Sequence, residues 1–243
     1  MKHQTTGLKN GAVIFLIAVF FGCATPPQQV PLNKGCIGEI ESVDVYIYLI
    51  HDKIHAEIED SNVTSYTGGG LIPALIDAGI ESSREDKAEV LLQPIRSAMA
   101  DYDCGDRLRT QIVGELSSLG WFKIGNVEVM KGTLEKDLKN DVKDSDANAV
   151  LAIGTDYYLS SDFKHLYLKG AIQLLPKSHT TEINFKDYLY RNMFSYRDPS
   201  DTYSNSPAEA ANKWAENNAA LTRQAIEDGA KYLAKHIADE LKL

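Results

Sequence analysis

The chain contains few of the features that usually identify a catalytic or nucleic-acid-binding protein. Only three of its 243 residues are Cys, and none lies in a Cys-x-x-Cys or Cys-His cluster. It also lacks the Gly-x-Ser-x-Gly elbow of serine hydrolases. The 25 Lys and Arg residues are outnumbered by 34 Asp and Glu residues, giving a formal charge of −9. Because nucleic-acid-binding surfaces need a basic excess, no nucleic-acid partner is expected.

Long apolar runs are also scarce, and the one that could interact with a membrane lies at the extreme N-terminus. Residues 11–22 are all small or apolar, and Lys2 and Lys9 precede them. Twelve helical residues span about 18 Å, which is shorter than the ~30 Å hydrocarbon core of a bilayer. This length and the basic flank are typical of a signal peptide and not of a transmembrane helix.

Gly22 and Cys23 resemble the lipobox of bacterial lipoproteins, in which a small residue precedes a Cys that is lipidated and becomes the first mature residue. The two Phe residues before them differ from the family pattern, which has Leu and then a small residue. The resemblance implies a lipoprotein signal peptide over 1–22 and lipidation of Cys23. Because Ala24 and not Asp follows, it also implies sorting to the outer membrane. An ordinary signal peptide cut after Ala24 is the alternative.

The residues after Cys23 are Pro-rich and show no periodicity, so we expect 23–34 to be the lipidated Cys and an extended tether. A single periplasmic domain is expected over 35–243. In an oxidising compartment, Cys36 and Cys104 are candidates for a disulfide, and two unrelated free thiols are the alternative.

The rest of the chain mixes strand and helix patterns without strict alternation, which predicts an α+β (mixed α/β) fold. We expect a sheet of about five to six strands with packed helices and a long C-terminal helix beginning at Pro207. Residues 43–49 and 53–60 are expected to form a hairpin around His51-Asp52. Pro94 is expected to kink a helix or mark its start, and Asp106 to cap the next helix. Further strands are expected at 121–130, 149–158, 164–175 and 181–196, and a short helix at 134–140.

Two segments in the middle of the chain resemble a known architecture. Residues 116–124 end a helix and enter a strand, and 146–154 enter another strand. They are similar to the periplasmic α/β core shared by curli-secretion-type and penicillin-binding-protein-activator-type outer-membrane lipoproteins. The resemblance covers residues 100–175. It implies an accessory role in the envelope and supplies no catalytic residue.

The sequence contains two groups of candidate metal ligands, and neither forms a complete metal-binding motif. His51 and His55 are four residues apart, but their segment has the pattern of a strand and turn, and no third ligand is apparent nearby. We therefore interpret them as surface histidines and expect no metal. Asp101, Asp103 and Asp106 suggest calcium, but the Gly comes one place early and position twelve is not acidic, so a cap and turn is favoured.

Other candidate sites are also incomplete. Gly68–Gly70 lacks the Lys-Ser/Thr of a P-loop, which favours a flexible loop. Glu57, Glu59 and Asp60 have no partner acid that their spacing can place, so glycosidase chemistry is unsupported. Six strand tyrosines are interpreted as core and edge packing, with a peptide- or glycan-binding face as the alternative: Tyr157, Tyr158, Tyr167, Tyr188, Tyr190 and Tyr196.

The segment 68–80 is a candidate contact element because it is apolar and carries one charge, Asp77. A segment so apolar must pack on the core or cover a membrane or partner surface. A short buried helix and an exposed element for self-association or membrane contact are both open. The apolar residues that recur at helical spacing are Leu71, Ile72, Leu75, Ile76 and Ile80.

Together these features predict an outer-membrane lipoprotein with its domain facing the periplasm. It would be a non-enzymatic assembly or accessory factor that acts through protein contacts and uses no cofactor. The expected partners are the membrane, through the lipid anchor, and an envelope protein or a second copy of the chain. One alternative is a lipoprotein that binds or transports a lipid or glycan, which an apolar cavity would favour. Another is an envelope hydrolase, which a cleft with a strongly perturbed carboxylate or His would favour.

Overall fold

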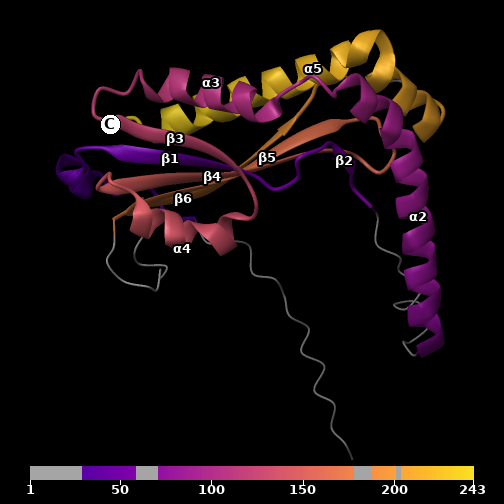
Figure 1. The fold of residues 1–243 in the computed structure, drawn as a ribbon, viewed down its shortest axis with the longest axis horizontal. Helices are drawn as coiled ribbons and strands as arrows, with labels where there is room; N and C mark the ends of the chain where they lie inside the picture. Colours follow the sequence, from indigo (N-terminus) through magenta and orange to yellow (C-terminus); the bar gives the residue numbers. More distant parts are fainter. Residues whose placement is uncertain (1–28, 59–70, 178–187, 201–203) are drawn as a thin grey trace, which may run out of the picture.

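The computed structural model describes residues 29–58, 71–177, 188–200 and 204–243, without the side chains of 36, 71–81, 135–137 and 139. These residues form a six-stranded sheet with helices on both faces (Figure 1), so the expected α+β class is confirmed. The strands are β1 (Val43–Leu49), β2 (His55–Ala56), β3 (Ile124–Lys131), β4 (Ala149–Leu159), β5 (Leu166–Pro176) and β6 (Tyr190–Arg197). The helices are the 3-10 helix η1 (Lys34–Glu39) and the α-helices α2 (Leu71–Ala98), α3 (Cys104–Leu116), α4 (Leu134–Asp144) and α5 (Pro207–Glu240).

The sheet is mixed, and its strand order is β3-β1-β4-β5-β6, with β2 also paired to β4. Strands β3, β1 and β4 run parallel, whereas β5 and β6 are antiparallel to their neighbours. All seven residues of β1 are buried. Such a continuous buried run is typical of a central strand in a sheet that is covered on both faces.

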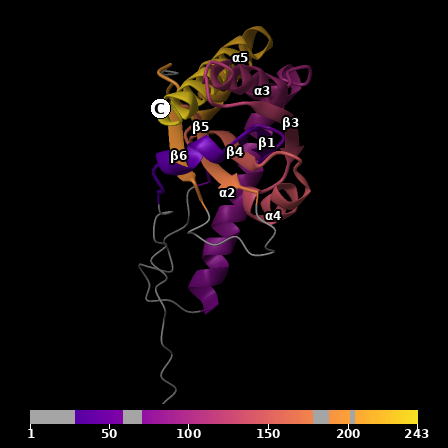
Figure 2. The same ribbon diagram turned by 90° about the vertical axis from the view of Figure 1, so that its left-hand side faces the viewer.

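Helices α3 and α5 cover one face of the sheet and α4 covers the other (Figures 1 and 2). Alternate residues of β4 therefore belong to different cores, because successive side chains of a strand point to opposite faces. Leu151 and Ile153 pack in the core formed with α3 and α5. Val150 and Ala152 pack in the smaller core formed with α4.

The expected hairpin between 43–49 and 53–60 is wrong. Strands β1 and β2 do not pair with each other, and both run parallel to β4. Leu49 is paired with Thr155 and His55 with Tyr158, so β2 continues the line of β1 after an interruption. The pairing partner lies about a hundred residues further along the chain, where local patterning cannot indicate it.

Several expected boundaries also differ from the structure. Helix α2 is continuous from Leu71 to Ala98 and includes Pro94 in its interior. Asp103, and not Asp106, is the N-cap of α3, since its side chain accepts a hydrogen bond from the backbone N–H of Asp106 at 2.9 Å. In the part of the chain that the structure describes, no helix has both the length and the apolar character needed to cross a membrane.

Helix α5 begins at Pro207 as expected, with Ser206 as its N-cap. It is kinked at three consecutive residues with positive φ, Asn217, Asn218 and Ala219. The part before the kink packs with α2 in one core, which also includes Ala225 and Ile226 just after the kink, and the helix from Ala230 onward packs with α3 and the sheet in another. The kink therefore allows one long helix to follow the molecule around a corner.

Part of the segment expected to be a free tether is joined to the domain. The backbone of Val30 forms hydrogen bonds of 2.9 Å in both directions with Arg191, and the Asn33 N–H donates to Leu189 O at 2.9 Å. From Val30 onward the described chain is thus held against the start of β6.

Candidate functional site

The interruption between β1 and β2 gives rise to a cluster of polar side chains. Leu49 of β1 pairs with Thr155 of β4, and His55 of β2 pairs with Tyr158 of β4. Five residues, 50–54, separate Leu49 from His55, whereas only two, 156 and 157, separate Thr155 from Tyr158. Three extra residues must therefore bulge out of the strand line. A bulge of this kind redirects side chains, and such features are common next to functional sites.

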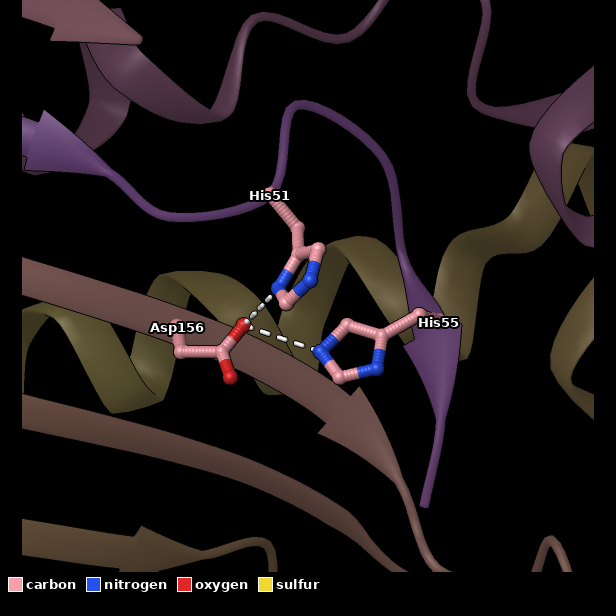
Figure 3. Close-up of side chains that lie close together, drawn as sticks. All are labelled: His51, His55 and Asp156. Atoms are coloured by element: carbon pink, nitrogen blue, oxygen red, sulfur yellow. Dashed lines mark hydrogen bonds and ion pairs between the residues drawn. The ribbon is translucent and has the colours of Figure 1, made fainter. Parts of the chain in front are cut away.

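The bulge brings His51 and His55 to the same carboxylate (Figure 3). His51 Nδ1 and His55 Nε2 each lie 2.9 Å from Oδ1 of Asp156. The two imidazole ring centroids are 4.0 Å apart. The side chains of His51, His55 and Asp156 are 49%, 26% and 20% exposed, respectively, so the cluster is open to solvent on the His51 side.

Helix α4 begins just short of this cluster. Leu134, its first residue, lies over Gly154, because a Cβ built there would be 3.2 Å from Leu134 Cδ1. Asp156 is two residues further along β4 and therefore on the same face of the sheet. Because α4 begins over Gly154 and does not extend over Asp156, the two histidines can reach the Asp156 carboxylate.

The electrostatic surroundings keep Asp156 ionised. Burial disfavours its charge, but the hydrogen bonds with His55 and His51 outweigh burial and hold the pKa of the Asp156 carboxyl below its ordinary value. Lys169 lies on the same side, with its Nζ 4.7 Å from the ring centroid of Tyr158. A hydrogen bond with Tyr158 raises the pKa of Lys169.

Sequence reasoning identified the two histidines and missed the carboxylate. The pair was interpreted as surface residues because no third ligand was apparent, but the structure supplies Asp156 from β4. About a hundred residues separate it from His55. The only local signal at that position is an acidic residue within an otherwise buried strand, where a charge is expected to have a partner.

A second polar feature is a cleft on the opposite face of the sheet, at the carboxyl ends of β1 and β3. Its volume is about 520 Å³. Ligands of open α/β sheets commonly bind at such an edge. The cleft is lined by charged, polar and apolar side chains, which include Asp52, Arg96, Tyr102, Cys104, Lys131 and Tyr157. It is therefore not the apolar cavity that would favour a lipid carrier.

Cys104 is buried at the edge of this cleft and its thiol is free. Of the two alternatives for Cys36 and Cys104, the structure thus has Cys104 as a free thiol and not in a disulfide. The seven residues of β1, which span about 20 Å, separate the two positions. Cys36 precedes β1 in η1, whereas Gly105, next to Cys104, lies near the other end of the strand, because a Cβ built at Gly105 would be 3.2 Å from Leu49 Cδ1. A disulfide requires Cα atoms within ~7 Å.

The other candidate residues have structural partners. Asp101 forms an ion pair with Arg223 at 2.5 Å and Asp103 caps α3, so the three aspartates of that segment do not form a common site. Tyr157 and Tyr190 are buried in the core, and Tyr158 stacks on Tyr167 with ring centroids 5.4 Å apart.

Tyr196 is half-buried and stacks near Tyr232, and Tyr188 lies beside Arg191. Glu57 is exposed. Cys23, Gly68–Gly70, Glu59 and Asp60 lie outside the described residues.

The apolar contact segment is helical in backbone, as its spacing indicates. Leu71, Ile72, Leu75, Ile76 and Ile80 form the beginning of α2, and their side chains lie outside the described part of the structure. The first turns of α2 extend away from the sheet and the other helices (Figures 1 and 2).

Comparison with known proteins gives little further information. No protein-family model matches the sequence, and the search of curated proteins found no match. One solved structure that the comparison matches is that of a protein from Xanthomonas campestris assigned to the family DUF330. It is 14% identical, the alignment covers 89% of each chain, and the TM-score is 0.36. At this level of similarity we draw no functional conclusion from it.

Proposed function

We propose that this chain is a lipid-anchored protein of the bacterial outer membrane that acts as a non-enzymatic assembly or accessory factor by contacting another envelope protein. The anchor rests on the apolar run before Cys23 and on the small residue, Gly22, that precedes it. The contact rests on the beginning of α2, which is the observation that carries the proposal.

The first turns of α2 extend beyond the packed part of the helix. Residues 82–87 are exposed, and the first buried side chain described in α2 is Ala88. At 1.5 Å per residue, the helix begins about 25 Å before that point. This distal part contains Leu71, Leu75 and Ile76, whose sequence is too apolar for an isolated surface helix. A partner surface is a suitable environment for such a helix.

The neighbouring surface supports a protein rather than a lipid as the occupant. Val90 is 70% exposed and lies in a shallow apolar hollow together with Pro207 and Ala208. The exposed helical turn that borders this hollow contains both signs of charge, at Arg84, Glu85, Asp86 and Lys87. Apolar patches rimmed by mixed charges are typical of protein interfaces.

Crosslinking in intact cells tests this contact. The double variant Leu75→Ser/Ile76→Ser should lose the crosslinked adduct while its Tm stays within about 2 °C of the wild type, because the proposal assigns these side chains to the partner contact and not to the core. Met193→Ser, which alters an exposed apolar residue on β6, should keep the adduct.

Two results would contradict the proposal. One is an unchanged adduct in the double variant. The other is a fall in stability of several kcal/mol, typical of core substitutions, which would place the segment in the core. An adduct with twice the mass of the chain would identify the partner as a second copy.

A further inference from the structure

We propose that His51, His55 and Asp156 form a binding site for a divalent transition metal ion of the zinc type, with one coordination position open. The three residues each offer one ligand atom, and these atoms all lie within 4.8 Å of one another. This site is independent of the proposed contact at α2.

The donor atoms already converge. His51 Nδ1 and His55 Nε2 both point to Oδ1 of Asp156 at 2.9 Å (Figure 3). Zinc binds imidazole nitrogen and carboxylate oxygen at about 2.0–2.2 Å, which sets neighbouring ligand atoms about 3.3 Å apart in a tetrahedral site. An ion between the three atoms therefore needs only small side-chain rotations from the observed arrangement.

Backbone hydrogen bonds of the sheet anchor the chain at, or next to, each of the three ligands. Asp156 lies inside β4, and His55, in β2, is paired with Tyr158 of β4. The residue before His51 is fixed to β4, because the Ile50 N–H donates to Thr155 O at 3.0 Å. The three side chains are thus positioned by strand pairing before any ion arrives, which lowers the entropic cost of binding.

The donor set selects the class of metal. Two imidazoles and one carboxylate suit Zn²⁺ and its neighbours in the first transition row, whereas Ca²⁺ and Mg²⁺ prefer sites made of oxygen ligands. Three protein ligands with a fourth position left to water are typical of open zinc sites. His51 is 49% exposed, so solvent or an anionic group of a ligand can reach that position.

Titration of the metal-free full-length protein, purified in detergent, tests the site. ZnCl₂ followed by calorimetry should show one ion bound per chain, and Co²⁺ should give the visible absorption of a four-coordinate site. His51→Ala, His55→Ala and Asp156→Asn should each weaken Zn²⁺ binding at least about tenfold. His236→Ala is the matched control, because His236 lies on α5 and contacts Tyr232, and it should bind Zn²⁺ like the wild type.

Hydrogen bonding without metal binding is the competing explanation of the cluster. It predicts no stoichiometric Zn²⁺ binding by the wild-type chain, and that result would overturn the proposal. Equal affinity of the wild type and His51→Ala would also overturn it, because the ion would then lie elsewhere. His51 is the most exposed of the three ligands, so its variant stays informative if Asp156→Asn fails to fold.

Discussion

Burial controls the chemistry of the Cys104 side chain. The residue is 8% exposed, and burial raises the pKa of its thiol from 9.0 to about 11 despite a hydrogen bond with Tyr157. At pH 8 only about one thiol in a thousand is ionised, and the thiolate is the reactive form. Because the folded protein favours the neutral thiol, the raised pKa contributes to the free energy of unfolding. This stabilisation is complete below pH 9.0 and is lost as the pH rises through about 11.

Cys104 should therefore react slowly with a disulfide reagent in the folded protein. In the variant Cys23→Ser/Cys36→Ser, labelling at pH 8 should be slower than in the denatured chain by about a hundredfold or more, and should accelerate toward pH 11. Rapid labelling of the folded protein at pH 8 would show that the thiol is accessible and ionised, contrary to its burial.

Single residues also show where sequence reasoning reaches its limit. His51 and His55 could be found from their spacing, but Asp156 could not, because strand pairing over about a hundred residues brings it to them. For Cys36 and Cys104 the sequence left a disulfide and two free thiols open for the same reason. A count of thiols cannot show that the length of β1 separates the two positions, because that is a property of the fold.

At the scale of elements, the positions of glycines decide how closely α5 approaches the sheet. A Cβ at Gly229 of α5 would lie 2.9 Å from Tyr196 Cδ1 and 3.2 Å from Leu168 Cβ. A Cβ at Gly114, which is exposed on α3, would meet nothing within 4 Å. The same substitution should therefore have opposite effects at the two positions.

Gly114→Ala should raise the free energy of unfolding by about 0.5–1 kcal/mol, the usual helix preference for Ala over Gly. Gly229→Ala gains the same preference but overpacks the contact between α5 and the sheet, which typically costs 1–3 kcal/mol, so a net loss of about 1 kcal/mol is expected. Urea denaturation of both variants measures this. A Gly229→Ala protein as stable as the wild type would show that α5 is not packed so closely.

Elements with a strong local pattern were predicted well. The strand expected at 149–158 is β4 (Ala149–Leu159), and the terminal helix begins at Pro207 with Ser206 as its cap. The hairpin was expected because two strand patterns separated by two polar residues usually pair with each other, and this expectation was wrong. Here β4 offers both of them a buried parallel partner. Pro94 does not start a helix, because it lies within helix α2.

At the scale of the whole molecule, the chain between Cys23 and the domain is short. Val30 is hydrogen-bonded to Arg191 beside the sheet, so seven residue steps separate Cys23 from the packed domain. At 3.3–3.6 Å per residue, an extended chain spans at most about 25 Å over this distance. With Cys23 lipidated, the domain would therefore work close to the membrane surface, within reach of other membrane-bound proteins.

Lipidation of Cys23 is the central claim of this account, and metabolic labelling with an alkyne fatty acid followed by cell fractionation tests it most directly. The wild-type chain and the control Cys36→Ala should be labelled and found in the membrane, because acyl chains contribute about 0.8 kcal/mol for each buried CH₂. Cys23→Ala should carry no label and move to the soluble fraction. Equal labelling and equal membrane retention of Cys23→Ala would contradict the account.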